Sequence, residues 1–210
     1  PGSAHVEWAR RHEPRTSNKS EAIGLVVNLK SGEPQDQVTA CLPCHTRRAR
    51  LTADDWAGRP FLDTFLPALL DPGLYHADGQ ILEEDYEYGS FLQTKMYQDG
   101  VRCVDCHNPH TLKLKAEGNA LCVQCHSERA DQRFPKLKPK VYDTPAHHFH
   151  TAYSPGALCV NCHMPAKNYM VVDPRRDHSF RIPRPDLSAR IGTPNACNSC
   201  HKEKTTRAKV

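Results

Sequence analysis

Residues 103–110 read CVDCHNPH, with Cys103 and Cys106 three positions apart and His107 directly after the second cysteine. On one helical turn this spacing places both sulfurs on the same side, with the imidazole beside them. Two such thiols can add to the two vinyl groups of one haem while the imidazole binds the iron. C-x-x-C-H is the pattern of c-type haem attachment. The segment therefore predicts a covalently bound haem.

The same five-residue pattern occurs five times and uses all ten cysteines of the chain. We therefore predict five haem c groups, each held by two thioether bonds and by one proximal histidine. The five sets are Cys41, Cys44 and His45; Cys103, Cys106 and His107; Cys122, Cys125 and His126; Cys159, Cys162 and His163; and Cys197, Cys200 and His201.

Three other uses of paired cysteines account for less of the pattern. Structural zinc sites take C-x-x-C pairs two at a time, and five pairs cannot be divided evenly among four-cysteine sites. A thioredoxin-like redox pair should lie near a βαβ pattern, and none of the five pairs does. Disulfides suit a small exported protein, but they give no reason for a histidine after every pair.

The composition leaves little apolar material for an ordinary core. The mean hydropathy is −0.67, there are 17 prolines, and Leu, Ile, Val and Phe make up only about 19% of the 210 residues. Haem rings would then supply most of the buried apolar surface. We expect residues 1–210 to form a single pentahaem module, mostly irregular with short α-helices that carry the motifs and little or no sheet.

The formal charge of +4 would by itself suggest an anionic partner, but haem propionates change the balance. With five haems the net charge becomes about −1 when oxidised and about −6 when reduced, so nucleic acid is not an expected partner. Arginine pairs well with carboxylates, and Arg47–Arg48 and Arg175–Arg176 are candidates to bind propionates, the alternative being solvated charged surface.

No apolar run approaches the roughly 18 residues that a membrane span needs. Haem c is attached outside the cytoplasm, so we expect the protein to be periplasmic or extracellular. The chain opens at Pro1 without a signal peptide, which suggests a processed or excerpted chain.

Local patterns predict a few regular elements between the motifs. Apolar spacing of three and four predicts helices in two places, with a kink or an end expected at Pro67 and a stop at Gly100. The predicted elements are helices over residues 6–11, 61–70 and 84–98, a short strand from residue 23, a surface loop over 127–145, an extended proline-rich segment from 171, and a frayed tail after His201.

Eight further histidines are available to bind the second face of each iron: His5, His12, His76, His110, His147, His148, His150 and His178. His110 follows His107 too closely to reach the far face of its own haem, but it can reach a neighbouring iron. We expect the second ligands to be His5, His76, His110, one of His147, His148 or His150, and His178. The remaining histidines would form hydrogen bonds or bind a haem of another chain, and Met96, Met164 and Met170 are less favoured ligands.

Four stretches resemble a family of exported multihaem cytochromes c, whose haem region often precedes tetratricopeptide repeats. They are PGSAHV (1–6), GLYHADGQILEEDYEYGSFLQTKMYQDGVRCVDCHNPH (73–110), GNALCVQCH (118–126) and the block from CVNCHMP to NSCH (159–201). The resemblance implies that the chain is part of a longer protein. A more remote similarity to the octahaem and tetrahaem cytochromes of nitrogen metabolism implies His5 and His178 as distal ligands.

If two histidines close every iron, no face is open to a substrate, and we expect electron transfer between exported redox partners rather than catalysis. One alternative is a subunit of an extracellular cytochrome filament that conducts electrons between its copies. Another is a multihaem oxidoreductase with one open haem that acts on a small nitrogen or sulfur compound. Pentahaem nitrite reductases carry a C-x-x-C-K motif at the catalytic haem, and this chain contains none.

Overall fold

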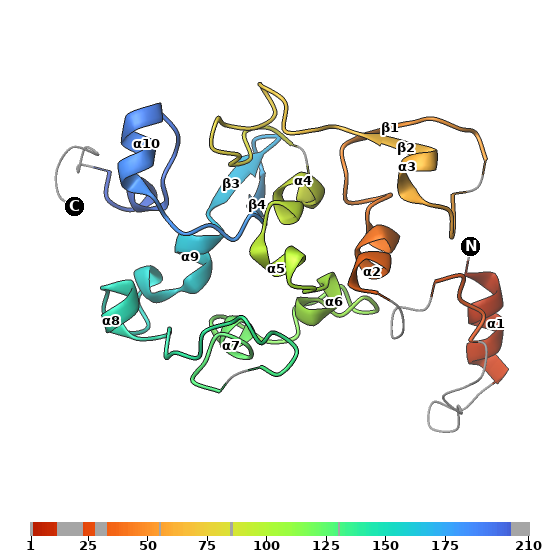
Figure 1. Ribbon diagram of the computed structural model, residues 1–210, viewed down its shortest axis with the longest axis horizontal. Helices are drawn as coiled ribbons and strands as arrows, with labels where there is room; N and C mark the ends of the chain where they lie inside the picture. Colours follow the sequence, from red (N-terminus) through yellow and green to blue (C-terminus); the bar gives the residue numbers. More distant parts are fainter. Residues whose placement is uncertain are drawn as a thin grey trace. The chain divides into compact units, whose positions relative to one another are not determined.

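A computed structural model describes residues 2–11, 23–27, 33–54, 56–84, 86–129 and 131–202 (Figure 1). Contacts within the chain divide it into two compact units. Unit 1 comprises Pro1–Cys44 and Arg48–Pro67, and unit 2 comprises His45–Arg47 and Ala68–Val210. Each unit is described by itself, and the expectation of a single pentahaem module over residues 1–210 stays a prediction.

Unit 1 contains α1 (Ser3–Arg11), α2 (Pro34–Cys41), β1 (Arg48–Arg50), α3 (Phe61–Thr64) and β2 (Phe65–Pro67). A proline in the first turn starts α2, where its missing N–H costs nothing, and the helix ends at the first cysteine of the first motif. Strands β1 and β2 pair antiparallel with Arg50 opposite Phe65. The helix predicted over residues 6–11 is confirmed and begins three residues earlier.

Two predictions in unit 1 are wrong. Residues 23–27 form bends rather than a strand, because Gly24 has a φ of 69° and the Ile23 carbonyl binds the His5 ring. The helix predicted over residues 61–70 ends at Thr64, since Phe65 is extended and pairs with β1. The side chains of Phe61 and Phe65 are buried and contact each other with ring centroids 5.4 Å apart. The leucines that suggested a longer helix are exposed.

Unit 2 carries the other four motifs on short helices and turns. Its elements are α4 (Tyr86–Leu92), α5 (Lys95–Gln98), α6 (Cys103–Cys106), α7 (Ala120–Val123), α8 (Pro145–His148), η1 (Pro155–Ala157), α9 (Cys159–His163), β3 (Ala166–Tyr169), β4 (Asp173–Arg176), α10 (Pro185–Ile191) and η2 (Ala196–Ser199).

The helix predicted over residues 84–98 is present as two pieces, α4 and α5. The break comes at Thr94, whose hydroxyl accepts a hydrogen bond of 2.9 Å from the backbone N–H of Tyr97 and so caps a new helix. Gly100, at a φ of 89°, follows the end of α5. The predicted stop at this glycine is confirmed.

The segment from residue 171 to the fifth motif is more regular than the sequence suggested. Strands β3 and β4 form an antiparallel hairpin in which Tyr169 pairs with Asp173. Pro185 then starts α10, and Gly192, with a φ of 75°, ends it. The expectation of an extended proline-rich segment agrees with β4, which is a strand, and is wrong over α10, because proline is well suited to a first helical turn.

Few apolar side chains are buried in the part of the chain that the structure describes: Val38, Leu42, Phe61, Phe65, Tyr75, Phe91, Phe134, Ala157 and Tyr169. The regular structure consists of short helices and two two-stranded sheets. The predicted fold class, mostly irregular with short helices and little sheet, is confirmed.

The predicted surface loop over 127–145 has no helix or strand before Pro145 among its described residues. Its Phe134 ring is buried, and an ion pair of 2.7 Å between Arg133 and Asp105 attaches the loop to the second motif. Within the described ranges, no helix combines the length and the apolar character that a membrane crossing would need.

Candidate haem-binding sites

Four of the five motifs fold locally in the same way. In three of them the backbone N–H of the histidine donates to the carbonyl of the first cysteine over 2.9 Å: His107 to Cys103, His126 to Cys122 and His201 to Cys197. The fourth, Cys159–His163, is helical throughout as α9. This turn brings the two sulfurs and the imidazole to one side, as the sequence predicted. All ten cysteines are half-buried or exposed.

The third and fourth motifs lie side by side. Asn119, which precedes α7, accepts a hydrogen bond from the backbone N–H of Cys159 at 2.9 Å and donates to the carbonyl of Ala157 at 2.9 Å. A hydrogen bond between the thiols of Cys122 and Cys159 lowers the pKa of Cys159 to about 7. Two haem attachment sites are therefore neighbours within unit 2.

Three proximal histidines face a second histidine at a similar distance. The ring centroids of His107 and His178 are 6.4 Å apart. The separation is 6.2 Å for His163 and His147, with nearly parallel rings at 5°. It is 6.0 Å in the third pair, which consists of His201 and His150.

These distances fit an iron between two imidazoles. A histidine nitrogen binds a metal ion at about 2 Å and lies about 1 Å from its own ring centroid, so two trans imidazoles have centroids roughly 6 Å apart. The donor set, two sulfurs and two imidazoles for each such site, suits haem c. Two members of the triplet, His147 and His150, face a proximal histidine, whereas the sequence led us to expect only one iron ligand from the triplet.

Backbone carbonyls orient several of these rings through the Nδ1 atom. His163 Nδ1 lies 2.7 Å from the carbonyl of Arg181, and His178 Nδ1 lies 3.0 Å from that of Arg176. His150 Nδ1 contacts the carbonyl of His148. Such a bond fixes the proton on Nδ1 and leaves the Nε2 lone pair for iron.

His45 is held differently, by a carboxylate. Its Nδ1 lies 2.9 Å from Oε2 of Glu87, and its carbonyl accepts from the backbone N–H of Tyr88 at 3.2 Å. Burial would raise the pKa of Glu87, but the hydrogen bond with His45 and the charges of His178 and His45 outweigh it, so the pKa is lowered. Glu87 therefore carries a negative charge at neutral pH.

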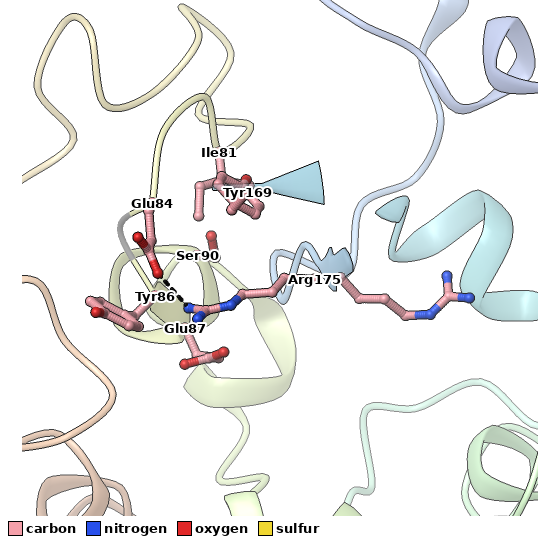
Figure 2. A pocket seen from close by; sticks show the side chains of 8 residues that line it. Ile81, Glu84, Tyr86, Glu87, Ser90, Tyr169 and Arg175 are labelled. Carbon is pink, nitrogen blue, oxygen red and sulfur yellow. Dashed lines mark ion pairs between the residues drawn. The ribbon is translucent and has the colours of Figure 1, made fainter. Parts of the chain in front are cut away.

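Glu87 lines a pocket in unit 2 between α4 and the β3–β4 hairpin (Figure 2). Arg175 spans this pocket and forms ion pairs with Glu84 at 3.1 Å and Asp173 at 2.7 Å. Its guanidinium lies 5.3 Å from the centroid of the Tyr86 ring. Figure 2 shows the Arg175 side chain directed at Glu84, which precedes α4, with Glu87 on α4 itself.

The ring beside His126 is a tyrosine. Tyr142 contacts it edge-on with centroids 5.7 Å apart, and the tyrosine hydroxyl donates to the carbonyl of Lys138 at 3.3 Å. A hollow of about 280 Å³ lies against His126 and Tyr142. Burial, together with the charge of His163, lowers the pKa of His126.

The structure gives other contacts for the remaining expected ligands. His5, in unit 1, stacks on Trp8 with centroids 5.5 Å apart and binds the Ile23 carbonyl through Nδ1 at 2.6 Å. His76 lies in a turn where its backbone N–H donates to Gln80 at 2.8 Å. His110 is exposed, and His12 lies outside the described residues. For these histidines the role of iron ligand stays a prediction.

For the three methionines the role of iron ligand stays a less favoured prediction. Met96 lies on α5, Met164 follows α9 directly, and Met170 is exposed.

The arginine pairs suggested for propionates have protein partners. Arg47 donates to the carbonyl of Glu84, and the Arg48 guanidinium lies 4.4 Å from the centroid of the Phe65 ring. Arg176 donates to the carbonyls of Val160 and Met164 at 3.2 and 3.0 Å, and to Asn161 Oδ1 at 3.2 Å. These hydrogen bonds hold α9 in place, a role for Arg176 that could not be predicted from the sequence.

An ion cluster joins the second and third motifs and was also missed. Asp105, inside the second motif, is only 9% exposed and accepts from Arg133 at 2.7 Å and from the backbone N–H of Arg102 at 2.8 Å. Arg133 also pairs with Asp131 at 3.0 Å. The position of Asp105, three residues after Arg102 at the start of a helical turn, is a capping signal that the sequence does contain.

Among the described residues, no three Cys, His, Asp or Glu side chains converge as ligands of a single metal ion.

Residues 95–131, which include the second and third motifs, match the family model of the doubled CXXCH motif. No curated protein matches the sequence. Over 99% of its length the chain superposes on the crystal structure of the outer cell wall cytochrome OcwA, with a TM-score of 0.52 and 14% sequence identity. It spans 53% of that chain, about half of its length. The family-model match covers the second and third motifs, and the structural similarity indicates that the chain shares the fold of a cytochrome.

Proposed function

We propose that this cytochrome carries electrons through five covalently attached haem c groups, and that two histidines bind most of the irons. The observation that carries the proposal is the repeated spacing of 6.0 to 6.4 Å between a proximal and a second histidine ring. On this proposal His178, His147 and His150 bind the irons of His107, His163 and His201. His5, His76 and His110 remain candidates for the other two irons.

The haems would supply the one-electron chemistry, and the chain supplies order and spacing. Asn119 and the adjacent sulfurs of Cys122 and Cys159 hold two attachment sites together, which favours electron transfer between neighbouring groups. The Nδ1 hydrogen bonds fix each imidazole in the tautomer that binds iron. With both faces closed, such a centre exchanges electrons without binding substrate.

The cellular setting follows from the cofactor and from the similar structure. Haem c is attached outside the cytoplasm, and the solved structure that shares the fold is described as an outer cell wall cytochrome. We infer an exported protein, periplasmic or extracellular, whose partners are other redox proteins. Self-association into a conducting filament stays a prediction from the sequence.

Two measurements on the purified protein test this function. The intact mass should exceed that of the polypeptide by five haems, and the electron paramagnetic resonance spectrum of the oxidised protein should be dominated by low-spin ferric signals. A mass gain of fewer than five haems would refute the count. High-spin signals from most of the iron would refute ligation by two histidines.

One observation favours a second candidate function, an oxidoreductase with one open haem. The hollow beside His126 and the edge-on Tyr142 mark this site as different from the three with facing histidines. An open iron there would bind a small nitrogen or sulfur compound. Nitrite, hydroxylamine or sulfite should then change the absorbance of about a fifth of the haem, and an unchanged spectrum would exclude it.

A further inference from the structure

The carboxylate of Glu87 stands next to the axial ligands of two different haem sites. It forms a hydrogen bond of 2.9 Å with Nδ1 of His45. On the same helix, the ring centroid of Phe91 lies 6.3 Å from that of Phe180, which lies 5.9 Å from that of His178. His178 faces His107 across 6.4 Å, and the carboxylate acts electrostatically on both rings. We propose that Glu87 is a shared residue that lowers the reduction potentials of the haems bound by His45 and His107. This proposal rests on the proposed electron-transfer function.

The hydrogen bond with His45 determines the first effect. When Nε2 of His45 binds iron, the remaining ring proton is on Nδ1, so the imidazole donates and the carboxylate accepts. His163 and His178 donate to backbone carbonyls instead. A carboxylate acceptor gives the ring more negative character than a neutral carbonyl does, and it makes the imidazole a more basic ligand. A more basic ligand favours ferric over ferrous iron.

The negative charge of Glu87 determines the second effect. Reduction adds one electron to the haem and needs no proton, so a fixed negative charge nearby opposes it. The side chain of Glu87 is 32% exposed, and its charge is only partly screened by solvent. Both the hydrogen bond and the charge lower the reduction potential of the haem of His45, whereas the charge alone lowers that of the haem of His107. The larger effect therefore belongs to the haem of His45.

The surroundings keep Glu87 available for this role. Arg175 is engaged with the neighbouring Glu84 and with Asp173, as Figure 2 shows for the pair with Glu84. The bond from Tyr88 N–H to the His45 carbonyl holds α4 beside His45. Arg175 therefore pairs directly with Glu84, and Glu87 pairs directly with His45.

The test is a spectroelectrochemical titration of the Glu87→Gln holoprotein. Glutamine keeps a carbonyl oxygen that accepts from Nδ1 but removes the charge, so folding and the hydrogen bond are preserved. We expect two of the five reduction steps to move to higher potential. The larger shift belongs to the haem of His45. Its reduction equilibrium constant should rise about tenfold, which for one electron corresponds to about 59 mV. The exposed Glu117, changed to glutamine, serves as the matched control and should leave the curve unchanged.

A further variant assigns the steps. His178→Met raises the potential of the haem of His107 by exchanging an imidazole for a thioether, which identifies its step in the titration. If Glu87→Gln fails to mature, Glu87→Asp keeps the charge at a changed distance and should shift the same two steps by less. A Glu87→Gln curve that coincides with that of the unchanged protein, at five haems per chain, overturns this proposal alone. A count below five haems in the unchanged protein overturns the proposed function instead.

Discussion

The third and fourth motifs are neighbours in unit 2, yet the chain surrounds their histidines in different ways. His163 of the fourth motif binds a backbone carbonyl through Nδ1 and faces His147 with nearly parallel rings. His126 of the third motif contacts an edge-on tyrosine beside a hollow. The fourth motif is fixed by hydrogen bonds from Arg176 to α9, and the third is tied to the second through the ion cluster of Arg133.

This difference shows what a five-residue motif decides and what it leaves to the rest of the chain. The motif fixes the two sulfurs and the proximal histidine, since the turn is local. The second face of the iron depends on segments that arrive from elsewhere, such as α8 for the fourth motif. The same attachment chemistry can therefore give a closed electron carrier at one site and a more accessible centre at the next.

The largest expected effect comes from removing the second ring at the fourth motif. The substitution His147→Ala should convert about a fifth of the iron from low spin to high spin, because one of five haems loses an axial nitrogen. Resonance spectra of the oxidised protein measure this share. Added imidazole should restore the low-spin signal by occupying the same position.

His148→Ala is the matched control, since it removes the adjacent histidine of the same helix. The His148 ring lies 6.4 Å from that of His150 and has no contact with a proximal histidine among the described residues. An equal loss of low-spin signal in both variants would show that the pairing of His147 with His163 is incorrect.

The sequence predicted the attachment residues and the fold class because both follow from local chemistry and from composition. Ten cysteines in five repeats of one C-x-x-C-H pattern can be recognised without tertiary information. The second ligands depend on which loops meet, and the sequence therefore could not distinguish His147 from His150. It assigned one ligand to a triplet that supplies two facing rings.

The predicted helix over residues 61–70 failed for a related reason. Apolar residues three and four apart suggest a buried helical face, but here Phe65 pairs with β1 and the leucines beyond it are exposed. In a chain that binds several large apolar cofactors, apolar residues need not pack against one another. Spacing alone is then a weaker guide to helix length.

The next effect in size tests how the fourth motif is held. Arg176→Gln should lower the free energy of unfolding by about 2 kcal/mol, because it removes charge-assisted bonds to two carbonyls at the end of α9 and to Asn161. Denaturant titration followed by the absorbance of the low-spin haems measures it. Arg184→Gln is the control, since that arginine pairs with Asp186 at the surface with both side chains more than half exposed, and it should cost less than about 0.5 kcal/mol.

A smaller effect is expected at the third motif. Arg133→Gln removes one partner of the buried Asp105, but Arg102 still donates to that carboxylate. Since the Arg133 side chain is 50% exposed, solvent screening limits the loss to about 1 kcal/mol. Lys136→Gln, which breaks a single surface pair with Asp99, is the control. If Arg133→Gln lowers the free energy of unfolding by more than Arg176→Gln does, the third motif depends more on its arginine than the fourth motif does, contrary to this prediction.

The smallest expected effect is a pH dependence at Asp131, which separates ionic from backbone support. Hydrogen bonds from Arg133 lower the pKa of Asp131 to about 2 from an ordinary value of 3.8. A carboxyl with a lowered pKa adds stability that is fully present above its ordinary value and is lost as the pH falls through the lower one. Thermal unfolding of the holoprotein should therefore show a slightly steeper decline between about pH 4 and pH 2 than that of Asp131→Asn. The Arg176→Gln variant should keep the full decline, because the hydrogen bonds that it loses are to groups that do not titrate between about pH 4 and pH 2. Identical pH profiles for Asp131→Asn and the unchanged protein would show that the ion pair of Asp131 with Arg133 adds no stability to the third motif.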